Sequence, residues 1–213
     1  MKPRAARVPK PAYWARAKRA LAQRDPVMAA IMARHPRVHL VSRGDPFQTL
    51  ARSIVGQQIS VKAAQSVWER LAAALGAVTP AGVLEARAER LRACGLSGRK
   101  VEYVFDLAGH FADGRLEPSR WAAMEDEAVI AELVEVRGIG RWTAEMFLMF
   151  NLLRPDVLPV ADLGLQRGVS LAYYRGRKVQ PGTVRRVAEK WRPYRSVATW
   201  YLWRSLDPVP VAY

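Results

Sequence analysis

Two glycines one residue apart, Gly138 and Gly140, interrupt the stretch LVEVRGIGRWTAEMF, which runs from Leu133 to Phe147. Glycine is unfavourable inside helices, so the pair predicts a tight turn between two helical segments. Such a turn leaves the first main-chain amides of the second helix unpaired. Those amides, together with the positive end of the helix dipole, form a site for a phosphate. An ordinary helix corner with a glycine cap is the simpler alternative, which this segment alone leaves open.

The elements that would position this turn are helices. Apolar spacing predicts one helix over 125–136 and the next over 141–153, with RGIG as the hairpin between them. Similar spacing recurs over 61–75, 97–112, 162–172, 183–191 and 193–205. Three more helices are predicted to begin at Asp25-Pro26, Asp45-Pro46 and Thr79-Pro80, where a capping side chain precedes a proline. No segment reads as a strand, so the predicted fold class is all-α, with exposed connections at 113–118 and 175–181.

The net charge indicates the kind of partner. The 213 residues contain 34 Lys and Arg against 19 Asp and Glu, a net charge of +15. Residues 1–24 hold eight basic residues and no acid, and residues 167–195 hold nine against one. Such clusters can be a solvated surface, but an excess this large favours a polyanion, nucleic acid before membrane.

Cysteine usage excludes several classes of site. Cys94 is the only cysteine, so an internal disulfide, a four-thiolate zinc site and a cysteine-held iron–sulfur cluster are excluded. The same usage fits a reducing cytoplasm. The start of the chain is basic without an apolar run, which predicts no signal peptide or membrane span. Residues 1–12 are expected to be a flexible basic segment.

Four blocks of sequence carry a resemblance to a known family. They are DPFQTLARSIVGQQISVKAAQSVWERL, LVEVRGIGRWTAEMF, DVLPVADLGLQRG and VRRVAEKWRPYRSVATWYLWR, and together they cover most of residues 45–205. In this order and spacing they closely resemble the 3-methyladenine DNA glycosylase II family, within the helix-hairpin-helix superfamily of base-excision glycosylases. Larger members carry an extra N-terminal β-rich domain, and this chain resembles the compact form without it.

The resemblance implies a two-lobed, all-helical fold with the active-site cleft between the lobes. Residues 13–213 would form the glycosylase unit. One lobe would span about 45–155 and contain the hairpin 134–144. The second would combine the N-terminal helices with 160–213.

The resemblance also assigns the hairpin to DNA binding. The amides of Gly138, Ile139 and Gly140 would hold a phosphate beside the lesion, with Arg141 and Thr143 next to them. The main-chain carbonyls of Val134, Val136 and Gly138 would bind a structural Na⁺ or K⁺ ion. Arg137 stands where the family usually has proline.

Asp162 matches the catalytic aspartate of the superfamily. Breaking an N-glycosidic bond builds positive charge on the sugar, which a carboxylate can stabilise, or the carboxylate can orient the attacking water. Asp162 is also well placed to cap the helix that follows it, and both roles can hold. Asp156 is the weaker candidate because it lies in the connection before the motif.

The residue after Arg141 decides the reaction subtype. Superfamily members that also cut the strand use a lysine there as the nucleophile. This chain has Trp142, so the enzyme is expected to be monofunctional. Trp142 and Trp203 match tryptophans of the family that form pocket walls, and an indole face attracts a cationic base. At Met146 relatives can carry a third aromatic residue.

The loop VGQQIS matches the one that inserts a side chain into the duplex in relatives. Gln58 is the first candidate for that side chain, followed by Gln57 and Ile59. Ser60 is better explained as the cap of the next helix.

These observations predict a monofunctional DNA glycosylase that releases alkylated, cationic purines such as 3-methyladenine and 7-methylguanine and leaves an abasic site. Its partner would be double-stranded DNA with damaged bases. We expect a cytoplasmic monomer, nucleoid-associated in a bacterium, with no required cofactor and no membrane contact. A glycosylase for another damaged or mismatched base, and a non-catalytic helix-hairpin-helix DNA-binding module, are the alternatives.

Overall fold

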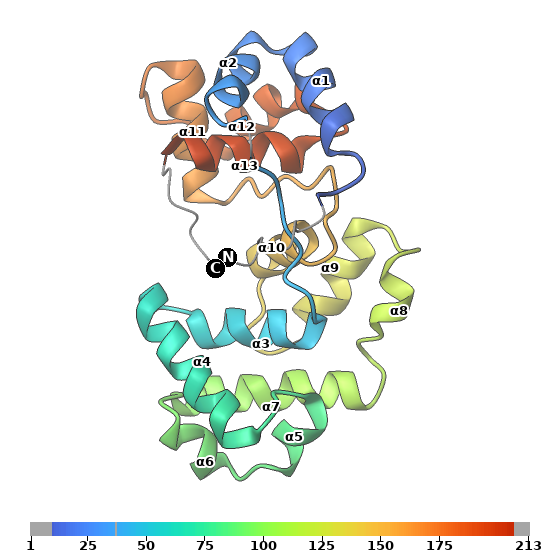
Figure 1. Ribbon diagram of the computed structural model, residues 1–213, viewed down its shortest axis with the longest axis vertical. Coiled ribbons are helices and arrows are strands. Elements are labelled where there is room, and N and C mark those ends of the chain that lie inside the picture. The colour runs from blue at the N-terminus through green and yellow to red at the C-terminus, as the bar shows by residue number, and fades with distance from the viewer. Residues whose placement is uncertain (1–9, 37, 207–213) are drawn as a thin grey trace, which may run out of the picture. The chain divides into compact units, whose positions relative to one another are not determined.

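The structure is a computed structural model that describes residues 10–36 and 38–206. The predicted flexible segment 1–12 lies mostly outside these ranges. The described residues form α-helices and one 3-10 helix without any strand, which confirms the predicted all-α fold (Figure 1). Within these ranges, no helix combines the length and the apolar character that crossing a membrane would require.

The chain divides into two compact units. The terminal unit takes the chain up to Ser42 and again from Leu152, and the central unit takes Arg43–Asn151. The terminal unit contains α1 (Trp14–Arg24), α2 (Pro26–Arg34), α11 (Leu163–Tyr174), α12 (Pro181–Ala188), the 3-10 helix η1 (Glu189–Trp191) and α13 (Arg195–Leu206). The central unit contains α3 (Pro46–Gly56), α4 (Val61–Leu75), α5 (Pro80–Glu85), α6 (Ala88–Ala93), α7 (Gly98–Ala112), α8 (Pro118–Trp121), α9 (Asp126–Val134) and α10 (Arg141–Phe150).

The three helix starts predicted from capping residues are confirmed. The carboxylate of Asp25 accepts the main-chain amides of Val27 and Met28 at the start of α2. Asp45 and Thr79 cap α3 and α5 in the same way. A side-chain acceptor followed by proline therefore sets these boundaries locally.

Asp25 also fixes the core of the terminal unit. Its fully buried carboxylate accepts the hydroxyl of Tyr173 (2.6 Å) and the indole N–H of Trp191 (2.9 Å), and it pairs with the ammonium of Lys190 (3.1 Å). Burial on its own would raise the pKa of Asp25, but these donors outweigh it and hold the pKa below the usual 3.8. One carboxylate thus ties α2 to α11 and η1.

The core of the central unit is aromatic. Trp121 is fully buried and meets the rings of Phe111 and Phe147 edge-on, and Phe111 in turn meets Phe47. These rings come from the end of α8, from α7, from α10 and from α3. The long helix α7 packs against both α3 and α5 and is the support on which the site below is built.

Several predicted boundaries differ from the structure. The helix expected over 125–136 ends at Val134, and the one expected over 141–153 ends at Phe150. The short helices α6 and α8 were not predicted because one or two turns are too short to show a period. The connection 113–118 is not fully exposed, since Leu116 is buried.

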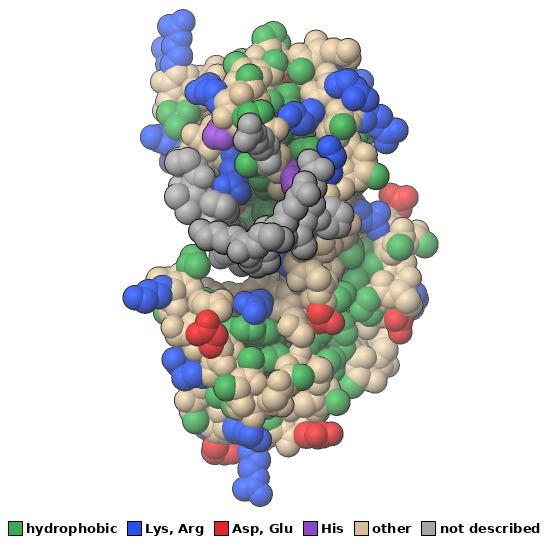
Figure 2. All heavy atoms as spheres, in the orientation of Figure 1, with side chains coloured by type: hydrophobic (Ala, Val, Ile, Leu, Met, Phe, Trp, Pro, Cys, Tyr) green, Lys and Arg blue, Asp and Glu red, His purple; other side chains and the backbone are tan. Residues whose placement is uncertain are grey.

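Charge is distributed unequally between the units. From Lys10 to Ser42 and from Leu152 to Leu206 the sequence has 18 Lys and Arg against 4 Asp and Glu, whereas Arg43–Asn151 has 13 against 14. Figure 2 shows Lys and Arg side chains spread over the visible face of the terminal unit. The basic excess of the described residues therefore belongs to one unit.

Candidate functional site

The hairpin joins α9 to α10 in the central unit, and its two glycines have different tasks. Gly138 has a φ of +84°, and a Cβ there would clash with the ring of Tyr103. Gly140 is the N-cap of α10, with a φ of −94° and open space where its side chain would be. Gly138 is therefore needed for the turn itself, and Gly140 keeps the front of α10 uncovered.

The N-terminus of α10 has unpaired main-chain amides. Within the part of the chain that the structure describes, the main-chain amides of Gly138, Gly140, Arg141 and Thr143 donate to no partner. The amide of Ile139 differs, because it donates to the carbonyl of Val136 (3.0 Å) inside the turn. Free amides at a helix N-terminus are suited to an anion.

Arg137 is also anchored through its backbone. Its main-chain amide donates to the carboxylate of Asp106 in α7 at 2.8 Å. Proline at this position would lack that donor. The hairpin of this chain is therefore fixed by a hydrogen bond where a proline ring would otherwise restrict it.

The side chain of Arg141 is engaged by two carboxylates of its own unit and is therefore not a simple phosphate contact. Its guanidinium pairs with Glu127 in α9 (2.9 Å) and with the buried Glu145 in α10 (3.2 Å). Hydrogen bonding from Arg141 lowers the pKa of Glu127, and the pair raises the pKa of Arg141. The arginine side chain links α9 to α10, so the group that Arg141 leaves available to an anion is its main-chain amide.

The three carbonyls expected to hold a cation differ in their surroundings. The carbonyl of Val136 accepts the amide of Ile139, and that of Gly138 accepts the side-chain amide of Gln57 (2.8 Å). A carbonyl oxygen has two lone pairs, so each can still contact a cation. Main-chain oxygens, including that of Val134, are hard ligands of the kind that Na⁺ or K⁺ takes. The donor set therefore fits such an ion.

The loop between α3 and α4 carries the predicted inserting side chains. Gln58 is exposed and has a φ of +58°, a left-handed conformation that few residues other than glycine adopt. Ile59 is 40% exposed. Ser60 accepts the amide of Ala63 and caps α4, as predicted. Gln57 turns back to the hairpin carbonyl, so Gln58 and Ile59 are the side chains that project from the loop.

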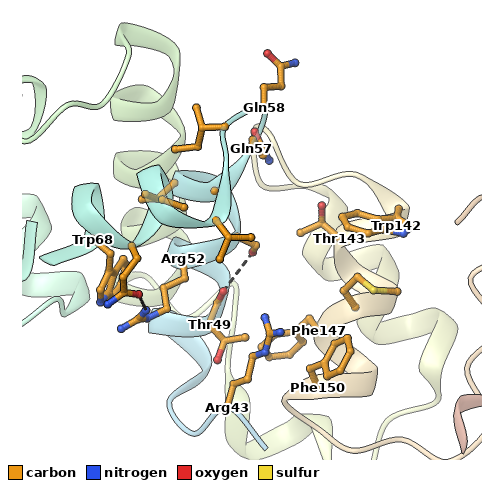
Figure 3. Close-up of a pocket in the computed structure, with 18 residues that line it drawn as sticks. Arg43, Thr49, Arg52, Gln57, Gln58, Trp68, Trp142, Thr143, Phe147 and Phe150 are labelled. Carbon is orange, nitrogen blue, oxygen red and sulfur yellow. Dashed lines mark hydrogen bonds between the residues drawn. The ribbon is translucent and has the colours of Figure 1, made fainter. Parts of the chain in front are cut away.

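A cavity of about 480 Å³ in the central unit brings several predicted residues together. Trp142, Thr143 and Met146 line it from α10, and residues 57–59 line it from the loop (Figure 3). The remaining wall includes Phe147, Phe150, Arg43, Arg52 and Trp68. Trp142 is 38% exposed and Met146 only 8%, so the indole is the more accessible of the two.

Trp68 contributes an aromatic ring to the wall of the cavity. Its side chain is buried, and its ring lies beneath the guanidinium of Arg52, with 4.3 Å between the guanidinium carbon and the ring centre.

In the terminal unit, Asp162 and Trp203 form a direct pair. One carboxylate oxygen of Asp162, Oδ1, accepts the indole N–H of Trp203 at 2.8 Å and the main-chain amide of Leu165 at 2.6 Å. The second bond caps α11, so the structural role expected for Asp162 is present. Two donors on one oxygen fix the orientation of the carboxylate group.

Two neighbours of this pair, Leu163 and Gly164, were not predicted from the sequence. A Cβ at Gly164 would lie 3.1 Å from both Asp162 Oδ1 and the indole of Trp203, so glycine leaves room for the pair. Leu163 is 78% exposed at the first position of α11, the most exposed of the large hydrophobic side chains described. The sequence signal that could have identified Leu163 is an apolar residue directly after the capping Asp162.

Asp156, the weaker candidate, is occupied by a structural task. Its carboxylate pairs with the guanidinium of Arg195 at 2.8 Å and with that of Arg192 at 3.3 Å. It joins the connection before α11 to the start of α13. No group of three or more His, Cys, Asp or Glu residues that could hold a metal ion occurs in residues 10–36 and 38–206.

Residues 51–193 match a known family, described as HhH-GPD superfamily base excision DNA repair protein. A putative DNA-3-methyladenine glycosylase of Bacillus subtilis is 32% identical over 188 residues, which cover 84% of this chain and 66% of the relative. DNA-3-methyladenine glycosylase 1 of Schizosaccharomyces pombe is 31% identical, over 78% of this chain and 74% of the relative. The chain thus spans two thirds to three quarters of the length of these two relatives.

Solved structures agree with the sequence matches. A DNA-3-methyladenine glycosidase from Bacillus halodurans has a TM-score of 0.82 at 37% identity, covering 89% of this chain and 88% of that one. A 3-methyladenine DNA glycosylase from Schizosaccharomyces pombe, solved in complex with abasic DNA, has a TM-score of 0.79 at 27% identity, covering 92% of this chain and 100% of that one.

Proposed function

The chain belongs to the HhH-GPD superfamily of base excision DNA repair proteins, and we propose that it is a monofunctional DNA glycosylase for alkylated purines. It hydrolyses the N-glycosidic bond of cationic bases such as 3-methyladenine and 7-methylguanine and leaves an abasic site. Its partner is double-stranded DNA that contains such a base. It acts as a monomer in the cytoplasm and, if its source is a bacterium, at the nucleoid.

The observation that carries the proposal is the pair formed by Asp162 and Trp203. A carboxylate oriented by two donors is suited to stabilise positive charge that develops on the sugar. The indole that donates to it has a π face for a cationic base. A DNA clamp without chemistry has no need for either residue.

The reaction requires only water and these groups. The bond between the sugar C1′ and the base nitrogen breaks, and its electron pair leaves with the base, which becomes neutral because it began as a cation. A water oxygen bonds to C1′ and releases its proton to Asp162 or to solvent. Trp142 stands where the strand-cutting relatives have a nucleophilic lysine, so the sugar–phosphate backbone stays intact.

The residues divide the remaining tasks. The amides of Gly138, Gly140, Arg141 and Thr143 hold a phosphate, while Ile139 packs beneath the turn. Gln58 fills the gap left by the extruded nucleotide, with Gln57 and Ile59 beside it. Trp142, Trp203 and Met146 contact the base.

No cofactor is required. The carbonyls of Val134, Val136 and Gly138 would hold a Na⁺ or K⁺ ion, which adds positive charge beside the phosphate.

The test is base release from methylated DNA by the purified protein, with the free bases separated by chromatography. We expect 3-methyladenine and 7-methylguanine to appear, and nicks to appear only after hot alkali. Borohydride should trap no covalent adduct. Efficient trapping would show a lyase, faster release of oxidised, mismatched or other neutral bases would favour a different lesion, and DNA binding without any base release would favour a non-catalytic module.

A further inference from the structure

Lys100, in the first turn of α7, holds the end of α3. Its ammonium donates to the main-chain carbonyls of Val55 (2.8 Å) and Gln57 (2.7 Å). Helix α3 ends at Gly56, and Gln57 follows in an extended conformation rather than the left-handed one that usually closes a helix. The last carbonyls therefore need an external donor, and a cation there also complements the helix dipole.

Forming these bonds takes the ammonium partly out of water. The side chain of Lys100 is half-buried, and this burial lowers its pKa because desolvation disfavours the charged form. A lysine that only decorated the surface would keep its hydration. Lys100 is instead committed to the backbone of the loop.

The residue directly after the held carbonyl is Gln58. Its left-handed backbone, with a φ of +58°, carries a cost that persists only where the surroundings impose it. Lys100 supplies one of those restraints, and Gln57 supplies another through its bond to the carbonyl of Gly138. Both restraints act on Gln57, and they thereby fix the backbone from which Gln58 projects.

The same face of α7 supports the hairpin. Tyr103 and Asp106 follow Lys100 at intervals of three residues, which places all three on neighbouring turns. The ring of Tyr103 lies against Gly138, and Asp106 accepts the amide of Arg137. One helix face therefore carries both the loop that inserts and the hairpin that binds phosphate.

We propose that Lys100 is a positioning residue for base excision: it fixes the loop 57–60 on α7, so that Gln58 enters the duplex at a set distance from the phosphate held by the hairpin. This inference rests on the proposed function. Lys100 touches neither the base nor the sugar in this scheme. It acts through Gln58.

The test compares Lys100→Met, which keeps the apolar stem but removes the donors, with Arg99→Met. Arg99 is the neighbouring residue of α7 and is exposed, and its side chain has no hydrogen bond or ion pair with any residue that the structure describes. The control therefore removes the same charge without releasing the loop. Lys100→Arg, which restores the charge and two donors, serves as the conservative rescue.

We expect Lys100→Met to lower the single-turnover rate of base release by roughly tenfold to a hundredfold, as misplacement of a positioning group does. Its affinity for undamaged DNA should match that of Arg99→Met. Lys100→Arg should recover most of the rate. A Gln58→Ala exchange should cost much less in the Lys100→Met background than in the native protein, because the two residues act together.

A second measurement, by fluorescence, does not depend on base excision. DNA with an abasic site opposite 2-aminopurine becomes more fluorescent when a side chain disrupts the stack, and Lys100→Met should reduce this rise at saturating protein. If Lys100→Met does not fold, Lys100→Gln, which is too short to reach both carbonyls, takes its place.

Native rates and native fluorescence in the Lys100 variant would overturn the inference, as would equal losses in the Arg99 control. Failure of the native protein to release methylated bases would instead contradict the proposed function, and the fluorescence on abasic DNA would still test the role of Lys100.

Discussion

The two units differ in the groups that they offer to a polyanion. Over Lys10–Ser42 and Leu152–Leu206, the terminal unit has 18 Lys and Arg against 4 Asp and Glu. The central unit, which carries the hairpin and the loop 57–60, has 13 against 14 over Arg43–Asn151. The hairpin offers neutral main-chain amides. Of its two arginines, Arg137 has an exposed side chain, and the guanidinium of Arg141 is paired with Glu127 and Glu145. Under the proposed function, long-range attraction to DNA and local recognition of a phosphate would thus be properties of different parts of the chain.

The candidate functional residues are also held in place differently in the two units. In the terminal unit, Asp162 is oriented by another side chain, Trp203, as well as by a helix amide. In the central unit, the hairpin and the loop are held through their main chains, by Lys100 and Asp106 of α7. Substitutions at the site should therefore change chemistry in the first case and geometry or binding in the second.

The largest effect that would test this division is expected from Asp162→Asn. The amide keeps an Oδ1 acceptor for Leu165 and Trp203, so the fold and the DNA affinity should remain. Loss of the negative charge should raise the activation free energy of base release by roughly 3 kcal/mol or more. Single-turnover kinetics would measure the lower rate. Asp156→Asn is the matched control and should reduce thermal stability through its arginine pairs rather than the rate. Near-native release by Asp162→Asn would place the catalytic charge elsewhere.

In the central unit, Gly140→Asp is expected to lower DNA affinity. Aspartate is a better N-cap than glycine and should slightly stabilise α10, while it covers the free amides and repels a phosphate. The melting temperature of the variant should therefore be higher than that of the native protein or equal to it. Its DNA affinity, measured by titration, should be lower.

Two further variants separate the causes. Gly140→Asn caps without charge and should weaken binding less than Gly140→Asp. Gly138→Ala should instead destabilise the protein by about 1–3 kcal/mol, because its left-handed backbone and the ring of Tyr103 oppose a side chain. Unchanged affinity of folded Gly140→Asp would mean that the front of α10 does not face DNA.

The tryptophans should show a smaller difference. Trp142→Leu removes one π face, worth about 0.5–2 kcal/mol for a cation, and should slow release of methylated purines more than release of neutral hypoxanthine. Trp203→Leu removes a π face and also a donor to Asp162, so it should slow both classes. Competition between the two lesions in one reaction measures this. Equal effects of both variants on both bases would show that the indoles only shape the pocket.

The smallest expected effect concerns salt. If phosphate attraction comes mainly from the terminal unit, Arg167→Gln in α11 should reduce the slope of log affinity against log salt concentration by about 0.9, the value for one phosphate contact. Arg87→Gln, an exposed position of the central unit, should leave the slope unchanged. Fluorescence anisotropy at several salt concentrations provides the measurement. The reverse ranking would contradict the assignment of long-range attraction to the terminal unit.

Much of the fold could be predicted because its signals are local. A capping side chain before proline identifies the starts of α2, α3 and α5 within two or three residues. The ends are less certain, as α9 and α10 show, because amphipathic spacing continues past the last helical turn. Helices of four to six residues, such as α6 and α8, leave no period to detect.

The site shows the same limit more sharply. Motifs assigned roles to Asp162 and Trp203 separately, but their hydrogen bond joins residues 41 positions apart and needed the structure. Lys100 carries no motif at all. Its partners, Val55 and Gln57, lie 45 and 43 positions earlier, and nothing in a run of residues reveals which carbonyls a lysine will meet after folding.

The bond from the Arg137 amide to Asp106 has a consequence for inheritance. Proline has no amide hydrogen, so relatives with proline in the hairpin gain nothing from an acceptor at the position of Asp106. We expect the two positions to covary across homologues, with aspartate or asparagine at 106 wherever 137 is not proline, and freer choice where it is. Two positions 31 residues apart would then be inherited as one pair.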